Sequence, residues 1–516
     1  MKQKMSLLLV FSFCYFISSS QISESDIDTL IKETLTTFEV PGISVGILKD
    51  NKLIYAKGHG VRSIKNKKDM NENTLVGVAS NSKGFTCFAL AMLLDEGKLH
   101  WDDKVRKHIP EFKLQDPWVT EEFTIRDLVT HRSGMGLGAG DLMFFPEGND
   151  FTIKDVLKGV QHLEPESSFR SKFRYNNNMF IIAGEVIKRV SGLSWEAFIE
   201  QRIMKPVGMT HSKASYNRVT DRSNIIEAHT RSEKEVVQIP HDWSATANPA
   251  GGIISNVVDM LTWAEFLMND AVTKNGERLL SEAQMHQLWQ LQTPLGVGKN
   301  HDYNSHFFGY GLGWFVSDVK GGYKQVTHTG GLLGTVTQFT MIPELDLAIV
   351  VLTNQMNGNA FRAITNTIKD SYLGYQDRAW LKTLGQRNTN WLAKNDSIKE
   401  AVYNQVKQMT SSRTLPKPNQ LVGTYTDDWF GDIIISHQKE GYTINCVRSP
   451  RLFGELLPYN ATTYVAKWND RSYDADVFVQ FTFDQDGKAQ NATMKYIAPI
   501  TDFSFDFHNL ELKRTK

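Results

Sequence analysis

The sequence predicts an α+β chain that ends in a small all-β domain. An alternating apolar pattern over Gly42–Tyr55, interrupted at Lys49–Lys52, is typical of a β-hairpin. The segment Val78–Leu99 contains apolar residues at helical spacing and predicts an amphipathic helix that ends near a glycine. From Leu421 onwards, short alternating runs recur at strand-and-turn spacing, which favours a separate all-β module.

Length and charge set broad limits. A chain of 516 residues is too long for one ordinary domain, and 41% hydrophobic residues are enough to build sizeable cores. Basic and acidic residues number 57 each, so the formal net charge is zero and no nucleic-acid partner is expected.

The first 20 residues differ from the rest of the chain. Met1–Met5 carries two lysines, Ser6–Ile17 is almost wholly apolar, and Ser18–Ser20 supplies small residues for cleavage. This pattern predicts a secretory signal peptide over residues 1–20 and export to the periplasm or the medium. Because no later run approaches about 18 apolar residues, no membrane span is expected.

Between the hairpin and the all-β module, helical and strand patterns alternate. Short helices are predicted before the main strands, and a polar helix with a linker follows them. The predicted helices are Thr124–His131, Phe151–Leu163, Met179–Leu193, a segment capped by Ser255 or Asn256 that runs to Met268, and Asp377–Met409. The predicted strands are Tyr323–Phe339 and Leu345–Thr353. The predicted linker is Ser411–Gln420.

Ser80 and Lys83 are one helical turn apart at the start of Val78–Leu99. A serine hydroxyl is a poor nucleophile until a base takes its proton, and a buried lysine can do this once its pKa is lowered. The helix N-terminus adds N–H groups where negative charge would develop. By chance alone, a chain of this length and composition contains roughly two or three serine–lysine pairs at this spacing. The motif therefore needs support from other parts of the sequence.

Tyr175 and Asn177 lie in a polar segment just before the predicted Met179 helix. A tyrosine near a serine–lysine pair can share the base role, because a neighbouring lysine cation makes its phenolate accessible. An asparagine can orient the lysine and hold a substrate amide. The alternative is a loop tyrosine with polar neighbours.

A third motif, His328–Gly331, lies on the first of two adjacent strands. Its glycines allow a substrate to approach the backbone closely, so the strand edge can pair with an extended ligand. The backbone N–H of Gly331 can then act with that of Ser80 as an oxyanion hole. The alternative is a tight turn at a strand end.

Other motifs carry less weight. Gly42–Gly46 matches G-x-S-x-G, but Ser44 sits inside an alternating strand and not in a strand-to-helix turn. Cys87 and Cys446 lack the spacing of a zinc site or a disulfide framework and are expected to be buried free thiols. No metal or organic cofactor is expected, since the 14 histidines include no H-E-x-x-H pattern.

In order and spacing, the three motifs resemble those of the penicillin-recognising serine hydrolases: class C β-lactamases, D,D-peptidases, D-aminopeptidases and related esterases. Further similar phrases are Thr124–Gly134, Gly251–Ser255, Gly309–Trp314 and Val350–Asn354. The resemblance implies an antiparallel sheet flanked by helices with an inserted all-helical lobe. It also implies a hydrolase domain over 21–376, a helical segment and linker over 377–420, and an all-β domain over 421–516.

The resemblance also implies roles for individual residues. Ser80 would be the acylated nucleophile, and Lys83 with Tyr175 the proton-transfer pair. The substrate-binding residues would be Asn177, His328, Thr329 and Gly330, and the oxyanion hole would consist of Ser80 and Gly331.

One departure concerns the substrate. Most β-lactamases and D,D-peptidases begin the third motif with a lysine, whereas this chain has His328, which is mostly neutral at pH 7. The alternative is that His328 becomes protonated beside a bound carboxylate and replaces the lysine. The sequence therefore favours an exported serine hydrolase of amide or ester bonds that is D-aminopeptidase-, peptidase- or esterase-like. The alternatives are a true β-lactamase or D,D-carboxypeptidase, and a catalytically silent binding protein. A small-molecule or peptide substrate is expected in either enzyme; the oligomeric state stays open.

Overall fold

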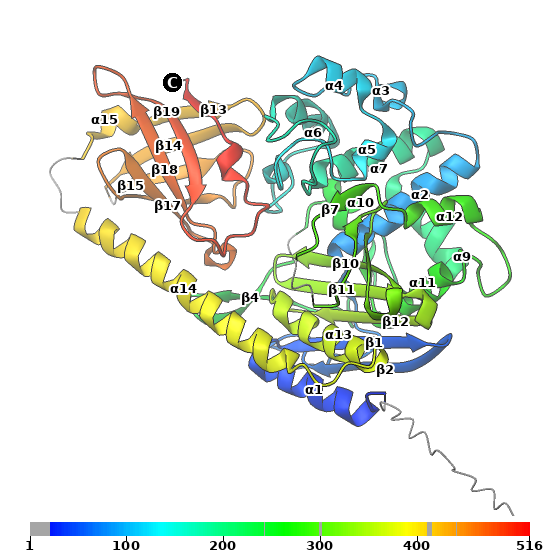
Figure 1. Cartoon of the computed structure of the whole chain (residues 1–516). Coiled ribbons are helices and arrows are strands. Elements are labelled where there is room, and N and C mark those ends of the chain that lie inside the picture. Colours follow the sequence, from blue (N-terminus) through cyan, green and yellow to red (C-terminus); the bar gives the residue numbers. More distant parts are fainter. Residues whose placement is uncertain (1–20, 242, 299–301, 410–414, 440, 516) are drawn as a thin grey trace, which may run out of the picture.

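An eight-stranded antiparallel sheet forms the centre of the larger part of the molecule (Figure 1). The computed structural model describes residues 21–241, 243–298, 302–409, 415–439 and 441–515, so the predicted signal peptide lies outside the described residues. The strand order is β2-β1-β12-β11-β10-β9-β8-β7. The strands are β1 (Gly42–Lys49), β2 (Lys52–Gly60), β7 (Thr293–Leu295), β8 (Phe308–Tyr310), β9 (Phe315–Asp318), β10 (Lys324–Leu332), β11 (Thr335–Ile342) and β12 (Leu347–Thr353).

The predicted hairpin at Gly42–Tyr55 is confirmed as β1 and β2, but the strand predicted over Tyr323–Phe339 is two strands. The chain reverses at Leu333–Gly334, where Gly334 has a φ of +79°. This left-handed conformation suits glycine in a two-residue turn. The turn has only two residues, so it does not interrupt the run of residues that predicts a single strand.

Helices cover both faces of the sheet (Figure 1). The helices α1 (Glu24–Thr37), α13 (Gly358–Tyr372) and the start of α14 (Trp380–Met409) pack their apolar side chains on one face. The helices α2 (Ser82–Asp95) and α11 (Val257–Met268) pack on the other face. The cap of α11 is Asn256, one of the two predicted residues, and its side chain accepts a hydrogen bond from the Asp259 amide.

The helix predicted at Val78–Leu99 is present, but it is not amphipathic. The short helix η1 (Ala79–Asn81) carries Ser80, α2 follows at Ser82, and Gly97 just beyond its end has a φ of +68°. Residues 82–93 are all buried, because α2 lies between the sheet and the surrounding helices. A helix buried on every side is the normal consequence of apolar residues around its whole circumference.

An all-helical lobe lies beside the sheet, as expected. The helix predicted at Thr124–His131 is only one turn long in the structure, and Thr124 caps its start in a capping box. The helices of the hydrolase domain outside the two layers on the sheet are α3 (Val105–His108), α4 (Pro117–Glu122), the capped turn α5 (Ile125–Leu128), α6 (Ile153–Gly159), α7 (Asn177–Ser191), α8 (Trp195–Phe198), α9 (Lys205–Val207), α10 (Asn248–Gly251) and α12 (Glu282–Leu288). Apart from the lobe, two small sheets pair β3 (Val76–Gly77) with β6 (Ile254–Ser255) and β4 (Ala228–Ser232) with β5 (Glu235–Ile239).

The C-terminal part is a closed eight-stranded antiparallel barrel, which confirms the predicted all-β domain (Figure 1). Alternate side chains fill its interior, among them Tyr425, Ile444 and Phe481, and closure leaves no free sheet edge. The barrel strands, preceded by α15 (Pro418–Leu421), are β13 (Gly423–Asp427), β14 (Gly431–Gln438), β15 (Gly441–Cys446), β16 (Phe453–Pro458), β17 (Thr463–Trp468), β18 (Val477–Phe483), β19 (Ala489–Tyr496) and β20 (Leu512–Arg514).

The barrel contacts both other parts of the molecule. Helix α14 is 30 residues long and packs Val402 and Val406 against the barrel while its start packs on the sheet domain (Figure 1). On the side of the helical lobe, the Asp506 carboxylate accepts hydrogen bonds from the Gly140 amide at 2.6 Å and from the Leu142 amide at 3.1 Å. These bonds tie the barrel to the lobe loop at positions 138–142.

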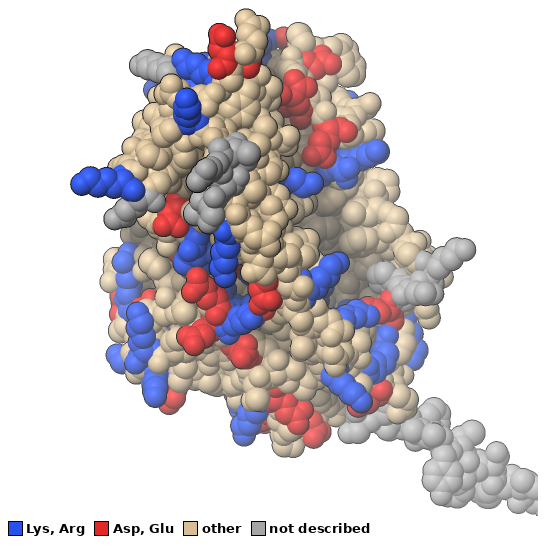
Figure 2. Space-filling view, turned by 90° about the vertical axis from the view of Figure 1, so that its left-hand side faces the viewer, with Lys and Arg blue, Asp and Glu red and all other residues tan. Residues whose placement is uncertain are grey.

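The charged surface gives no sign of a polyanion site on the face that Figure 2 displays. Lys and Arg side chains alternate there with Asp and Glu side chains (Figure 2), in keeping with the zero net charge. Within the described residues, no helix combines the length and apolarity needed to cross a bilayer.

Strand β10 lies against η1 at Gly330, and this contact yields a stability prediction. A Cβ on Gly330 would meet the Val78 carbonyl oxygen at 2.3 Å and the Thr337 hydroxyl oxygen at 2.5 Å. We expect Gly330→Ala to lower the free energy of unfolding by about 1–3 kcal/mol, because the added methyl group has no room and forces its neighbours apart. Denaturant unfolding measures the change.

Gly331→Ala is the matched control, because a Cβ at this position meets nothing within 4 Å. We expect its free energy of unfolding to stay within about 0.5 kcal/mol of the parent value. Equal destabilisation by the two substitutions would contradict the packing argument.

Candidate active site

Ser80 lines a cavity of about 390 Å³ at which the sheet, the helical lobe and the barrel meet. The lobe contributes mainly aromatic side chains, the sheet contributes the end of β10, and the barrel contributes the segment Asp502–Ser504. The lining residues are Ser80, Leu137, Phe144, Phe145, Phe173, Tyr175, Asn177, Trp243, Phe315, His328, Thr329, Gly331, Leu332, Leu333 and Asp502–Ser504.

The Lys83 amine is held by three oxygen atoms from separate segments. Its Nζ atom lies 3.0 Å from Ser80 Oγ, 2.8 Å from Asn177 Oδ1 and 2.7 Å from the carbonyl oxygen of Ala250. The two carbonyl-type oxygens only accept hydrogen bonds, whereas the serine hydroxyl can donate or accept. A neutral amine therefore keeps all three bonds by donating to Asn177 and Ala250 and accepting from Ser80.

Burial favours this neutral form. Lys83 is fully buried, and burial lowers the pKa of its ammonium group to about 7, although the Asp141 carboxyl opposes the shift. Removal from water penalises the charged form of a lysine. At neutral pH a large fraction of Lys83 is thus able to take a proton from Ser80.

Asn177 connects Lys83 to a buried carboxyl that sequence analysis did not identify. Sequence analysis placed Asn177 in a loop, but it is the first residue of α7, which Asn176 caps. Its amide nitrogen donates to Asp141 Oδ2 at 2.8 Å, and Ser504 Oγ of the barrel donates to the same oxygen at 2.8 Å. Burial and the nearby Asp506 raise the pKa of Asp141 well above its ordinary value.

Tyr175 is close to the serine–lysine pair, but its ionisation differs from the expectation. The Lys83 amine lies 4.9 Å from the centre of the Tyr175 ring. Burial raises the pKa of the Tyr175 phenol, and its hydrogen bond with Ser80 only partly offsets this. The expected ready access to a phenolate is therefore wrong for the free protein, and Tyr175 is a protonated hydrogen-bonding group. The His131 ring packs against it, with 4.1 Å between the ring centres and an interplanar angle of 31°, and fixes its position.

His328 is buried and neutral. Burial lowers its pKa to about 3, and the Lys83 charge adds to the shift. Its Nδ1 atom lies 2.6 Å from the carbonyl oxygen of Thr329, so Nδ1 carries the proton. Its Nε2 atom then accepts a hydrogen bond from the Tyr310 hydroxyl at 3.1 Å. The imidazole therefore provides no positive charge to the cavity.

The end of β10 has an open edge facing the cavity. Strand β9 pairs only with residues 324–327 of β10, while β11 pairs with residues 326–332 on the other side. Thr329 and Gly331 are exposed, whereas Gly330 is buried against Val78 and Ala79, next to Ser80. Five backbone units, 328–332, thus remain without a β9 partner beside the candidate nucleophile.

The other sequence motifs lie away from this site. Ser44 is buried in the middle of β1, and its hydroxyl donates to the Asn71 carbonyl oxygen, which agrees with its rejection as a nucleophile. Cys87 and Cys446 are buried free thiols, as predicted. Across the described residues, no group of three or more His, Cys, Asp and Glu side chains is arranged to hold a metal ion.

Structure comparison supports the fold. The octameric penicillin-binding protein homologue from Pyrococcus abyssi superposes with a TM-score of 0.60 at 20% sequence identity, over 92% of this chain and 98% of that one. At this identity the similarity concerns the fold.

Sequence comparison links the chain to named hydrolases and related proteins. Unguisins hydrolase ungD' of Aspergillus campestris is 26% identical over 435 residues, which cover 79% of this chain and 76% of the relative. Protein flp of Staphylococcus aureus is 26% identical over 332 residues, so the chain covers 63% of that protein's length. The C-terminal residues 407–514 match a domain of unknown function. The Beta-lactamase family model matches residues 27–373, and the chain therefore belongs to the Beta-lactamase family of serine hydrolases.

Proposed function

We propose that this chain is an exported serine hydrolase that cleaves amide or ester bonds through an acyl-enzyme on Ser80. The observation that carries the proposal is the 3.0 Å contact between Lys83 Nζ and Ser80 Oγ, with the two other positions around the amine filled by acceptor oxygens. A base with a pKa near the working pH and within hydrogen-bond reach of a hydroxyl is what nucleophilic catalysis by serine requires.

The proposed cycle uses the site residues in turn. Lys83 takes the proton as Ser80 Oγ attacks the substrate carbonyl carbon, and the backbone N–H groups of Ser80 and Gly331 stabilise the oxyanion. The Tyr175 hydroxyl donates its proton to the leaving group and recovers it from the Lys83 ammonium. A water molecule then attacks the acyl carbon and gives a proton to Lys83. The bond between Ser80 Oγ and the acyl carbon breaks, Lys83 returns the proton to Ser80 Oγ, and the carboxylic acid is released. Positioned proton transfer of this kind is typically worth about 10²–10⁴-fold in rate.

The cavity favours a substrate that carries no negative charge next to the scissile bond. Among its described lining residues there is no Lys or Arg side chain, and His328 is neutral. A carboxylate beside the leaving group would find no fixed cation other than the base itself. This supports a D-aminopeptidase-, peptidase- or esterase-like activity over a β-lactamase or D,D-carboxypeptidase activity. The name of the Aspergillus campestris relative, a hydrolase, is in keeping with this proposal.

Export is the second part of the proposal and rests on the composition of residues 1–20. Expression of the full chain followed by cell fractionation and N-terminal sequencing tests it. A mature protein found outside the cytoplasm and beginning near residue 21 is the expected result, and an intact Met1 in the cytoplasm would exclude export.

Labelling the protein with a fluorophosphonate and with a fluorescent penicillin tests the reaction class. We expect the fluorophosphonate to label Ser80, because the serine is activated, and the penicillin to label it weakly, because the cavity has no cation for its carboxylate. Gel fluorescence and peptide mass measurement identify the labelled residue.

Ser80→Ala is the control for both probes. Strong penicillin labelling that disappears in Ser80→Ala would favour the β-lactamase or D,D-carboxypeptidase alternative. Absence of label from both probes would favour a catalytically silent binding protein.

The pKa of Lys83 predicts the acidic side of the pH–rate profile. Because only the neutral amine accepts the serine proton, and burial lowers this pKa to about 7, kcat/KM for a neutral ester is expected to rise tenfold per pH unit below pH 7 and to level off above it. Stopped-flow or steady-state rates in buffers of constant ionic strength measure the profile. A profile that is flat between pH 5 and pH 8 would exclude Lys83 as the titrating base.

The neutrality of His328 predicts that charge selectivity does not change with pH. Since burial lowers its pKa to about 3, the imidazole stays uncharged at both pH 5.5 and pH 8. The ratio of kcat/KM for a neutral ester to that for a matched anionic ester is therefore expected to be constant, within about twofold, between these pH values. A preference for the anionic ester that grows at pH 5.5 would show that His328 becomes protonated beside a bound carboxylate.

A further inference from the structure

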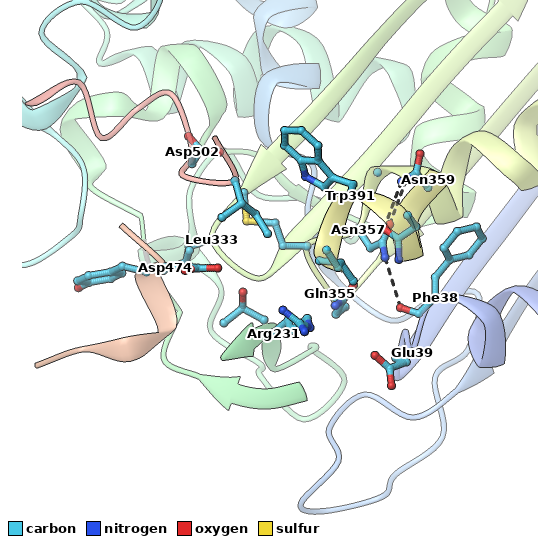
Figure 3. A pocket seen from close by; sticks show the side chains of 17 residues that line it. Phe38, Glu39, Arg231, Leu333, Gln355, Asn357, Asn359, Trp391, Asp474 and Asp502 are labelled. Atoms are coloured by element: carbon cyan, nitrogen blue, oxygen red, sulfur yellow. Dashed lines mark hydrogen bonds between the residues drawn. The ribbon is translucent and has the colours of Figure 1, made fainter. Parts of the chain in front are cut away.

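A second cavity, of about 260 Å³, lies where the sheet domain, helix α14 and the barrel meet (Figure 3). We call it the junction cavity. Figure 3 shows side chains from distant parts of the chain converging on it: Phe38 and Glu39 between α1 and β1, Arg231 on β4, Leu333 in the β10–β11 turn, Gln355 and Asn357 between β12 and α13, Asn359 at the start of α13, Trp391 on α14, and Asp474 and Asp502 of the barrel.

The junction cavity adjoins the cavity that holds Ser80. Leu333 and Asp502 line both of them, so these two side chains form the partition between the two spaces. Leu333 belongs to the turn that follows the open edge of β10. A chain laid along this edge from Ser80 and continued beyond Leu332 therefore arrives at the partition.

The proton-transfer groups indicate which part of a substrate takes this direction. Tyr175 and Lys83 must face the leaving group to protonate it, and Tyr175 packs near His328, with 6.2 Å between the ring centres. The leaving group thus belongs at the His328 end of the open edge. The acyl group belongs at the opposite end, at Gly331–Leu333, beside the partition.

The walls of the junction cavity suit a chain that carries amides. The side chain of Gln355 is only 4% exposed, and its Oε1 atom accepts no hydrogen bond from any described residue. A buried oxygen without a donor costs free energy that a ligand N–H would recover. The amide nitrogens of Asn357 and Asn359 already donate to the Phe38 carbonyl oxygen and to Asn388 Oδ1, and Trp391 adds an apolar surface.

Among the described lining residues of the junction cavity, Arg231 is the only cation and it is already paired, while Glu39, Asp474 and Asp502 are acidic. Arg231 donates two hydrogen bonds to the Asp396 carboxylate, at 3.2 and 2.7 Å, so it is not positioned to select an anion. An uncharged chain with amide groups and apolar side chains matches this combination better than a phosphate or a carboxylate does.

We propose that the junction cavity is a distal acyl subsite for a peptidyl amide or ester. The acyl chain of the substrate runs from Ser80 along residues 328–332 of β10, passes between Leu333 and Asp502, and donates an amide N–H to Gln355 Oε1. The proposal rests on the proposed function and names its substrate class: a peptide chain of several residues on the acyl side of the scissile bond. The barrel takes part in substrate selection because it supplies Asp502.

Two series of p-nitrophenyl esters test this proposal with the full chain. The first has a single N-acetylated residue on the acyl side, and the second has four residues that end in the same residue. We expect kcat/KM to be at least tenfold higher for the long esters than for the short ones. We expect Gln355→Leu to reduce this gain by about tenfold, the effect of one lost hydrogen bond, without changing kcat/KM for the short esters.

Thr365→Val is the matched control variant. Thr365 Oγ1 is a second buried polar atom without a hydrogen-bond partner among the described residues, and the residue lines neither cavity. Both substitutions replace an unsatisfied polar group by an apolar one of similar size, so neither is expected to lower the midpoint of thermal unfolding. Thr365→Val should leave both ester series unchanged.

The other outcomes distinguish a failure of the proposed subsite from a failure of the proposed function. Equal kcat/KM for short and long esters, or a gain that persists in Gln355→Leu, would overturn the subsite while leaving the hydrolase intact. A loss of activity on both series in Gln355→Leu would show a structural role and also overturn it. Absence of hydrolysis and of Ser80 labelling with every probe would instead overturn the proposed function, and with it the subsite.

Discussion

The site depends on the desolvation of one amine. Lys83 is fully buried, and its three neighbours come from η1, α7 and α10, segments far apart in the sequence. The carbonyl-type oxygens of Asn177 and Ala250 accept hydrogen bonds from an ammonium group as well as from a neutral amine. Hydrogen bonding alone therefore does not leave Lys83 unprotonated at neutral pH. Burial determines the protonation state of Lys83, because it destabilises the ammonium form while the two acceptor oxygens stay in place. Every element that excludes water from Lys83 therefore favours its neutral form, which the proposed reaction at Ser80 requires.

The barrel is one of these elements, and it reaches the amine through a chain of hydrogen bonds. Ser504 and Asn177 both donate to one carboxyl oxygen of Asp141, and Asn177 in turn accepts from Lys83. The Asp506 carboxylate holds the backbone on both sides of Asp141. The orientation of the Asn177 amide is thereby fixed, because its nitrogen must face Asp141 and its oxygen must face Lys83. The barrel thus acts on the same group that the sheet and the lobe position.

Those parts of the candidate site that depend on local spacing can be predicted from the sequence. Ser80 and Lys83 face one another because they are one helical turn apart, so their contact could be predicted. Asn177 is singled out by its motif, but the sequence places it in a loop and not at the start of α7. Asp141 could not, because its partner Ser504 is 363 residues away and no local pattern connects them. The Ala250 contact uses a backbone carbonyl, which has no side-chain signature. The amphipathic helix prediction failed for a related reason: residues 82–93 are buried on every side by segments that the sequence does not place.

The low polarity of the cavity affects both the protonation state of Lys83 and the charge that a bound substrate can carry. The same burial that lowers the pKa of Lys83 to about 7 lowers that of His328 to about 3, so both groups are neutral in the active form. An anion bound beside Lys83 would stabilise its ammonium form and raise its pKa, which would remove the base at neutral pH. A fixed cation in the place of His328 would offset that effect, but the imidazole is too deeply buried to carry the charge. An uncharged acyl substrate avoids the conflict, since it leaves the neutral amine in place for the proposed attack by Ser80.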